Sequence, residues 1–528
     1  MIFSIPKKHG SALFDIIQDT ADKGKQALVF VNTKKSAEKV AEDLSLSLNL
    51  KISQKRKSEL LRLSKKALHA LDTPTAQCER LSRCISKGVS FHHAGLVSAQ
   101  RNLIEDNFRS GQLSFIIATP TLAAGVDLPA YRVIIRDLKR FSRGRMVHMP
   151  VMEYKQQAGR AGRPKYDKEG QSLVIVSTEG EKDKITKRYI YGSPEEIYSK
   201  LAVEPVLRSS VLSLVAGNFF SSKPALLDFF SRTFWAHQFQ DMGRIAYFID
   251  NTLNELEEWG FVKQNENDKL SATPLGKRVS ELYLDPYTAH TFVEALKKIE
   301  KGKELNKDNC SVISLISSSL ELRPLPGVYA REIEAVSMLI GENYEDFLFD
   351  VPTEFDMEYE DFLKSVKFSQ IVAEWLSESG EEALYEKYSL RPGELRQKLE
   401  IFDWLLYSFS EISRICRVKQ VANLVHRLRI RLKYGAREEL IPLLQVKNIG
   451  KVRARALYSA GIRNIGDVKR AGMPKLSSLI GSRTAERVLA ELGVIKSPKN
   501  LETQDNYDEQ DFIPEQKKGQ KGLNSFLN

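Results

Sequence analysis

The chain has few cysteines and no spacing that builds a cysteine-based site. Its 528 residues include four, at Cys78, Cys84, Cys310 and Cys416. Four scattered thiols are too few for a disulfide framework. Cys78 and Cys84 precede His92 and His93, but the gap between the two cysteines is wrong for a zinc knuckle, and a second paired element is absent. We therefore expect ordinary thiols and no metal site.

Long apolar runs are also missing. No run approaches the roughly 18–20 apolar residues that cross a bilayer, and Met1–Gly10 lacks the pattern of a signal peptide. These absences predict a cytoplasmic protein without a membrane partner. The formal net charge of +11 favours a polyanionic partner such as nucleic acid, although a merely basic protein would show the same charge.

Short apolar runs alternate with helical patterns over the first third of the chain. They lie at 26–32, 89–94, 115–119, 133–135 and 173–177. This alternation predicts an α/β region with a parallel sheet over about residues 1–185.

After residue 190 the pattern becomes mostly helical. Arg244–Trp259 has apolar residues at helical spacing, Gly260 ends that helix, and two short strands are expected at 261–264 and 269–272. This order is typical of a winged helix, although any helix followed by a hairpin has the same pattern. Residues 286–433 are expected to be helical almost throughout.

The segment 434–495 contains a small duplication. An apolar residue, a glycine and a basic helix start occur at 449–453, and a similar unit occurs at 480–483. Such a turn directs backbone N–H groups at a phosphate, which is how a helix-hairpin-helix grips nucleic acid without reading sequence. The predicted DNA contacts are Gly450, Lys451, Arg453, Gly481 and Arg483. The polar residues 496–528 are expected to form a flexible tail.

The most specific pattern lies between Ile116 and Pro164. It reads IIATPTLAAGVDLPA at 116–130 and EYKQQAGRAGRP at 153–164. Arg160 and Arg163 are spaced so that a tight turn and helix start can present both guanidinium groups to a phosphate chain. Yet the sequence contains no G-x-x-x-x-G-K-[ST] loop and no D-E-x-[DH] box. The two patterns that usually hold the nucleotide phosphates in a nucleotide-driven motor protein are therefore missing from this sequence.

These two segments resemble motifs V and VI of superfamily 2 helicases. ALVFVNTKKSAEKVAEDL at 27–44 is similar to motif IV. Likeness to archaeal repair helicases of the Hjm type, named for Holliday junction migration, continues through RPGEL (391–395), DWLLYS (403–408) and IGKVRARALYSAGIRN (449–464). The resemblance spans nearly the whole chain.

The resemblance implies a multidomain α/β plus α fold. The expected parts are one RecA-like parallel-sheet domain carrying motifs IV, V and VI (1–190), a winged helix (191–285), a helical ratchet domain (286–433), a helix-hairpin-helix DNA-binding domain (434–495) and a tail (496–528). In the family, ATP lies between this RecA-like domain and a first one, which holds most of the ATP and Mg²⁺ contacts.

The resemblance also implies roles for single residues. On the nucleotide side, Arg160 and Arg163 match the motif VI arginines, and Arg163 is the better candidate for an arginine finger that contacts the ATP phosphates. Gln156 matches the motif VI glutamine. The other residues expected there are Gly125, Asp127 and Gly159. On the DNA side, Thr119 matches a backbone contact, and 138–150 matches a strand-separating β-hairpin with Arg143 and Arg145 at its tip.

Trp404 has two interpretations. A tryptophan on an apolar helix usually belongs to a core, whereas the family places one at the matching position to stack on a base of the translocating strand, worth roughly 1–3 kcal/mol. Some relatives have an arginine one turn earlier; here that position is Gln397, with Arg396 adjacent. Arg396 is therefore the candidate for the second contact.

The last eight residues before Asn528 fit Q-x-x-[LIM]-x-x-[FY]-[FLY]. They resemble the peptide that docks repair proteins on the sliding clamp PCNA, through Gln520, Leu523, Phe526 and Leu527. A flexible tether with one polar anchor and three apolar side chains suits such docking.

These observations lead to a split-motor hypothesis. The chain is expected to be the C-terminal half of an ATP-dependent 3′–5′ DNA helicase for branched or forked DNA in repair and replication restart, because Met1 falls in the linker before the second RecA-like domain. A separate polypeptide would supply the first RecA-like domain. The alternatives are a non-catalytic DNA- and clamp-binding module, a truncated fragment, and an RNA helicase of the Ski type.

Overall fold

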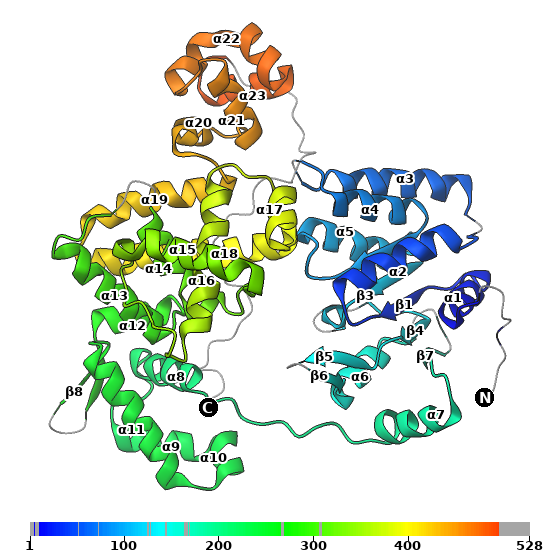
Figure 1. Ribbon diagram of the computed structural model, residues 1–528, viewed down its shortest axis with the longest axis horizontal. Helices are drawn as coiled ribbons and strands as arrows, with labels where there is room; N and C mark the ends of the chain where they lie inside the picture. The colour runs from blue at the N-terminus through cyan, green and yellow to red at the C-terminus, as the bar shows by residue number, and fades with distance from the viewer. Residues whose placement is uncertain are drawn as a thin grey trace. The chain divides into compact units, whose positions relative to one another are not determined.

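The computed structural model of the chain is shown in Figure 1. It describes Ile5 and residues 10–495, except positions 51, 72, 124, 125, 127, 143, 144, 163–166, 168, 266–268 and 306–308. The chain folds as two compact units, Met1–Glu438 and Glu439–Asn528. In the described ranges, no helix combines the length and the apolar character that crossing a membrane requires.

A five-stranded parallel sheet forms the core of the N-terminal region. Its strands lie in the order β2-β3-β1-β4-β7. Their bounds are β1 Ala27–Phe30, β2 Val89–His92, β3 Phe115–Ala118, β4 Arg132–Ile135 and β7 Gln171–Val174. All residues of β1 to β4 are buried, which explains why these strands read as continuous apolar runs. The predicted parallel sheet is confirmed, with boundaries shifted by a few residues.

Helices and one hairpin surround this sheet, as Figure 1 shows in blue and cyan. They are α1 Ala12–Asp22, α2 Lys34–Ser47, α3 Gln54–Leu68, α4 Ala76–Ser86, α5 Ser98–Arg109, the 3₁₀ turn η1 Pro120–Leu122, α6 Val151–Ala158, α7 Glu179–Ile185 and the π turn η2 Thr186–Ile190. The side chains of Thr33, Ser53 and Thr75 accept hydrogen bonds from backbone N–H groups and so fix where α2, α3 and α4 begin. The strands β5 Lys139–Ser142 and β6 Arg145–His148 pair antiparallel, so the expected β-hairpin is present.

Residues 191–285 contain helices and a short antiparallel hairpin. The elements are α8 Glu204–Ala216, α9 Lys223–Ser231, α10 Phe234–Phe239, α11 Met242–Glu258, β8 Val262–Gln264, β9 Leu270–Ala272 and α12 Pro274–Glu281. Gly260 follows α11 with φ of 75°, a left-handed conformation in which glycine meets no Cβ penalty. The expected helix, glycine and hairpin are therefore confirmed, while the name winged helix stays a prediction.

The next part of the first unit is almost wholly helical, as predicted. Its elements are α13 Pro286–Glu300, α14 Cys310–Ser317, η3 Leu320–Leu322, η4 Ala330–Glu332, α15 Ile333–Glu342, η5 Tyr344–Asp346, α16 Tyr359–Leu376, α17 Glu381–Tyr388, α18 Pro392–Ile415 and α19 Lys419–Tyr434. The 24-residue helix α18 buries one face, including Leu395, Phe402 and Phe409, in a core shared with α8–α14. Packing on both ends of α18 fixes where its remaining side chains point.

The second unit is a small helical domain. It contains α20 Ile441–Leu444, α21 Lys451–Ser459, α22 Ile465–Ile480 and α23 Ser482–Glu491, and the 3₁₀ turn η6 Glu438–Leu440 lies at the junction of the units. Gly472 interrupts α22 with φ of 66°, so the helix consists of two pieces. The second piece, the turn at Gly481 and α23 form one hairpin, and α20, the turn at Gly450 and α21 form the other.

Candidate nucleotide and nucleic-acid sites

The segment just before β4 and the turn after α6 meet at the amino edge of the parallel sheet. Ala130 forms a bridge with Ala161. In it, the Ala130 N–H donates to the Arg160 carbonyl at 2.9 Å, and the Gly162 N–H donates to the Ala130 carbonyl at 2.7 Å. The two segments that carry the most specific sequence pattern are therefore joined by backbone hydrogen bonds.

Arg160 is oriented by the first of these segments. One of its terminal guanidinium nitrogens, Nη2, donates to the Ala123 carbonyl at 2.7 Å, in the turn that follows η1. Gln156 lies one helical turn earlier on α6 and is exposed, and the exposed Gly159 caps the helix. Three of the residues expected on the nucleotide side thus lie along one short segment. Gly125, Asp127 and Arg163 fall outside the described residues, so their placement stays a prediction.

Thr119 sits between the sheet and this loop. Its N–H donates to the His92 carbonyl at 3.1 Å, and its hydroxyl lies 3.0 Å from the hydroxyl of Thr121. The side chain is buried. A DNA contact at this position would thus have to reach a hydroxyl that is already engaged, and the contact stays a prediction.

Gln157 is a residue that the sequence reasoning missed. It is fully buried, and neither atom of its amide has a hydrogen-bond partner among the described residues. Buried amides are normally satisfied, and exceptions gather at functional sites. A glutamine at a buried position of a helix directly before a Gly-Arg turn is the sequence signal that could have revealed it.

The β5–β6 hairpin is tied to α6. Arg140 on β5 forms an ion pair with Glu153 on α6, with 2.9 Å between Nη1 and Oε2. Arg145 begins β6 and is exposed, whereas Arg143 lies outside the described residues. The hairpin is therefore tied to the helix that precedes Arg160, and its strand-separating role stays a prediction.

Helix α18 carries the candidate stacking residue. Trp404 is partly buried against the core, and its indole N–H donates to the Leu282 carbonyl at 3.2 Å. Arg396 is nearly half exposed and forms an ion pair with Glu381, at 2.8 Å between Nε and Oε1. Both interpretations of Trp404 find support here, because one part of the ring packs and the rest stays accessible.

The second unit presents its two predicted turns. Gly450 precedes α21 and Gly481 precedes α23, and a Cβ added at either glycine would meet no atom within 4 Å. Arg453 and Arg483, in the first turns of these helices, are exposed. Open backbone at two helix starts, each flanked by a cation, is the arrangement that binds phosphates.

Known protein families match three parts of the chain. The family described as "Helicase conserved C-terminal domain" matches residues 48–165, "Archaeal helicase, domain 4" matches 310–435, and "SAM-like Helix-hairpin-helix tandem" matches 440–493. The first contains Arg160, the second contains Trp404 and the third contains both glycine turns.

Whole-chain relatives agree with these matches. The ATP-dependent DNA helicase Hel308 of Methanocella arvoryzae is 38% identical over 498 residues, which are 93% of this chain and 66% of the relative. The protein of the same name from Pyrococcus horikoshii is 37% identical over 497 residues, covering 92% of this chain and 67% of the relative. The chain belongs to the Hel308 family of archaeal DNA helicases. It spans about two thirds of the length of these relatives.

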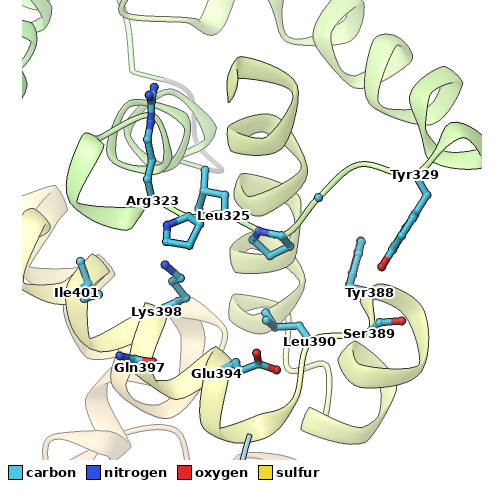
Figure 2. A pocket seen from close by; sticks show the side chains of 13 residues that line it. Arg323, Leu325, Tyr329, Tyr388, Ser389, Leu390, Glu394, Gln397, Lys398 and Ile401 are labelled. Atoms are coloured by element: carbon cyan, nitrogen blue, oxygen red, sulfur yellow. The ribbon is translucent and has the colours of Figure 1, made fainter. Parts of the chain in front are cut away.

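A cavity of about 490 Å³ adjoins α18 of this Hel308-family chain (Figure 2). Gln397 lines it together with Lys398 and Ile401. Figure 2 shows Lys398 directed toward the segment that carries Arg323 and Leu325. The Lys398 ammonium donates to the Leu322 carbonyl, and burial lowers its pKa below the ordinary value. The cavity thus lies on the same helix as Arg396 and Trp404.

Proposed function

We propose that this chain is the C-terminal half of an ATP-dependent 3′–5′ DNA helicase that acts on branched or forked DNA in repair and replication restart. The observation that carries the proposal is the position of Arg160. Its guanidinium is held by the Ala123 carbonyl, in the segment that leads from β3 to β4 of the parallel sheet. A guanidinium only donates hydrogen bonds and matches the geometry of a phosphate chain, so the oriented Arg160 fits one face of an ATP cleft.

The chemistry of such a cleft is electrostatic. Phosphoryl transfer needs little covalent help from the protein, and arginines act by neutralising charge on the transferring group. Arg160 and Arg163 would supply this charge, and Gln156 would orient groups beside it. ATP and Mg²⁺ would be held mainly by a RecA-like domain that carries a Walker loop, and this sequence has no such loop.

An exposed apolar patch supports the presence of a further protein body. Ile197 and Tyr198 are about 70% exposed, and Phe234 and Phe239 on α10 are about half exposed. Gln238 brings these side chains together, because its amide donates to the Ile197 carbonyl at 2.8 Å and accepts from the Ser199 N–H at 2.7 Å. Grouped apolar side chains on a surface mark a site that another protein covers. We assign the RecA-like partner domain to this patch.

The ATPase of a mixture tests the proposal. DNA-stimulated ATP hydrolysis is measured for this chain alone, and for this chain with a polypeptide that carries a Walker loop, such as the part of the Methanocella arvoryzae relative that this chain does not span. Activity only in the mixture, lost in Arg163→Ala and in Arg160→Ala, supports the split motor. Absence of activity in the mixture while DNA still binds would contradict it.

The second candidate is a non-catalytic module that holds DNA and a clamp. The observation that favours it is the second unit, whose two open glycine turns would bind phosphate without ATP. Its clamp peptide, Gln520 to Leu527, lies outside the described residues. If this second candidate is correct, the chain should bind PCNA and Phe526→Ala should abolish that binding. The mixture with the Walker-loop polypeptide should then show no ATPase activity. An RNA helicase of the Ski type is tested by comparing DNA and RNA of one sequence as stimulators of the ATPase.

A further inference from the structure

A buried carboxylate lies where α2 meets the start of α18. The side chain of Glu38 on α2 is only 4% exposed. It accepts hydrogen bonds from Gln77 Nε2 at 3.1 Å and from Arg80 Nη1 at 2.7 Å, both within the α/β region. The third donor is Nε of Arg391, at 3.2 Å, and it comes from the residue that precedes α18. One carboxylate thus joins parts of the chain more than 350 residues apart.

His93 completes the surroundings of this carboxylate. It is fully buried, and its Nε2 lies 3.2 Å from Oε1 of Glu38. Its Nδ1 accepts a hydrogen bond from the Gly95 N–H at 3.1 Å, which places the ring proton of a neutral imidazole on Nε2, toward Glu38. Burial alone raises the pKa of Glu38, but His93, Arg391 and Gln77 together lower that pKa to about 2. The carboxylate is therefore ionised and fully engaged.

Backbone contacts tighten the same junction. The Gly393 N–H, in the first turn of α18, donates to the Gly95 carbonyl at 3.0 Å. A Cβ added at Gly393 would lie 2.2 Å from the Leu96 carbonyl oxygen, closer than any side chain permits. The helix therefore approaches the loop after β2 at a distance that only glycine allows.

Two further contacts flank the junction. Lys34 at the start of α2 forms an ion pair with Glu394 in the first turn of α18. The Ala76 N–H at the start of α4 donates to Oε2 of Glu382 on α17 at 3.1 Å. Both α17 and α18 are thus fixed to the α/β region by contacts around Glu38.

We infer that the α/β region and helix α18 move as one rigid body, and that Glu38 is the positioning residue that holds them together. The functional consequence rests on the proposed function. Arg160 belongs to the α/β region, while Arg396 and Trp404 lie on α18. A shift of the α/β region during ATP turnover would then carry the DNA-contacting side chains with it, without a hinge between them.

Spin-label distances test the rigid body on the chain alone. Labels are placed at Asp106→Cys on α5 and Arg414→Cys on α18, both well exposed, with Cys310 and Cys416 replaced by serine. We expect one narrow distance distribution in the parent protein, and a broad one in Gly393→Ala. A broad distribution in the parent, or an unchanged one in Gly393→Ala, overturns the inference.

A second glycine provides the matched control. Gly243 is also the second residue of its helix, α11, but a Cβ there would meet only Asp241 Oδ1 at an ordinary 3.6 Å. Gly243→Ala should keep the distribution narrow. If Gly393→Ala does not fold, Arg391→Gln removes the cross-link through the side chain instead. Arg391→Lys keeps the charge and should restore a narrow distribution in part, which a general loss of packing would not produce.

The reconstituted ATPase adds a functional readout. With the Walker-loop polypeptide present, Gly393→Ala is expected to lower the base pairs unwound per ATP by about five-fold while changing ATP hydrolysis less than about two-fold. Equal loss of both quantities would contradict a positioning role. If the mixture has no ATPase at all, the proposed function fails while the distance measurement still decides the rigid body.

Discussion

The α2–α18 junction and the second unit use arginine in opposite ways. Arg391 is mostly buried and directs its guanidinium at the ionised Glu38, whereas Arg453 and Arg483 are exposed beside open glycine turns. Arg453 contacts only a backbone carbonyl of its own loop, that of Asn448, among the contacts resolved for the described residues. The same side chain therefore fixes geometry when it is buried and remains available to a polyanion when it is exposed.

The physical reason is the cost of desolvation. Removing a guanidinium and a carboxylate from water is unfavourable, and the pair is retained only when every donor and acceptor is engaged. Glu38 accepts hydrogen bonds from Gln77, Arg80 and Arg391, and His93 Nε2 lies 3.2 Å from it. An exposed arginine loses little solvation and contributes little to folding, but it can release counterions from DNA.

The largest effect is expected at the buried carboxylate. Glu38→Gln leaves the mostly buried Arg391 without its counter-charge, which should lower the free energy of unfolding by about 3–5 kcal/mol. Denaturant unfolding of the first unit measures it. The control is Glu42→Gln, one turn later on α2, whose longer contacts of 3.6 and 3.7 Å with Arg80 and Arg83 predict a loss below about 1 kcal/mol. Equal losses of unfolding free energy in Glu38→Gln and Glu42→Gln would contradict the special role of the buried carboxylate.

The second effect concerns DNA affinity rather than stability. Replacing both Arg453 and Arg483 by glutamine should weaken DNA binding about ten-fold at moderate salt, and should reduce the slope of log K against log salt by about 2, since each lost phosphate contact contributes about 0.9. Fluorescence anisotropy at several salt concentrations measures both. The melting temperature should stay unchanged. An unchanged salt slope would show that these arginines do not contact phosphate.

The third effect is a pH dependence of the junction. Burial lowers the pKa of His93 below its ordinary value of 6.5, despite the neighbouring Glu38, so the unfolded chain binds a proton there that the folded chain does not. The stability from this neutral imidazole is complete above pH 6.5 and declines as the pH falls toward the lowered pKa. Between pH 7.5 and 5.5, the free energy of unfolding should fall more steeply in the parent protein than in His93→Gln. The difference should be up to about 1 kcal/mol per pH unit.

Denaturant midpoints across this range provide the measurement. The exposed His69→Gln serves as control, because its ring lies at the end of α3 and away from Glu38. Glu38 itself adds a dependence at lower pH, since stability from its lowered pKa is lost only between about pH 4.5 and 2. A parent slope equal to that of His93→Gln would argue against a buried neutral His93.

The smallest effect tests whether burial or position in the fold sets the energy of an arginine ion pair. Arg396 lies on α18 only five residues after Arg391, but nearly half of its side chain is exposed. Arg396→Gln should change the free energy of unfolding by less than about 1 kcal/mol, although it removes the ion pair with Glu381. A loss as large as that of Glu38→Gln would show that place in the fold, rather than burial, sets the energy.

Much of the architecture could be predicted because each element has a local signal. Continuous apolar runs indicated all five parallel strands, and Gly260 marked the end of α11 before its hairpin. The glycine turns of the second unit were visible for the same reason, since an exposed phosphate-binding turn needs only a short segment.

The junction around Glu38 had a weaker signal. Glu38 lies three residues before Ala41, on the face of α2 that also buries Ala37 and Leu44. A carboxylate on an apolar helix face is unusual and could have been recognised from the sequence. The partners of Glu38 could not be predicted from the sequence, because Arg391 follows 353 residues later.

The sequence by itself determined the family pattern, the parallel sheet, the helical regions and the two phosphate-type turns, because these depend on residues close together in the chain. Only the tertiary structure decided that Arg160 is held by the Ala123 carbonyl, that Gln157 is buried with no hydrogen-bond partner among the described residues, and that Glu38 joins α2 to α18. Each of these depends on long-range packing, which brings distant groups within hydrogen-bond distance and removes the water that would otherwise separate them.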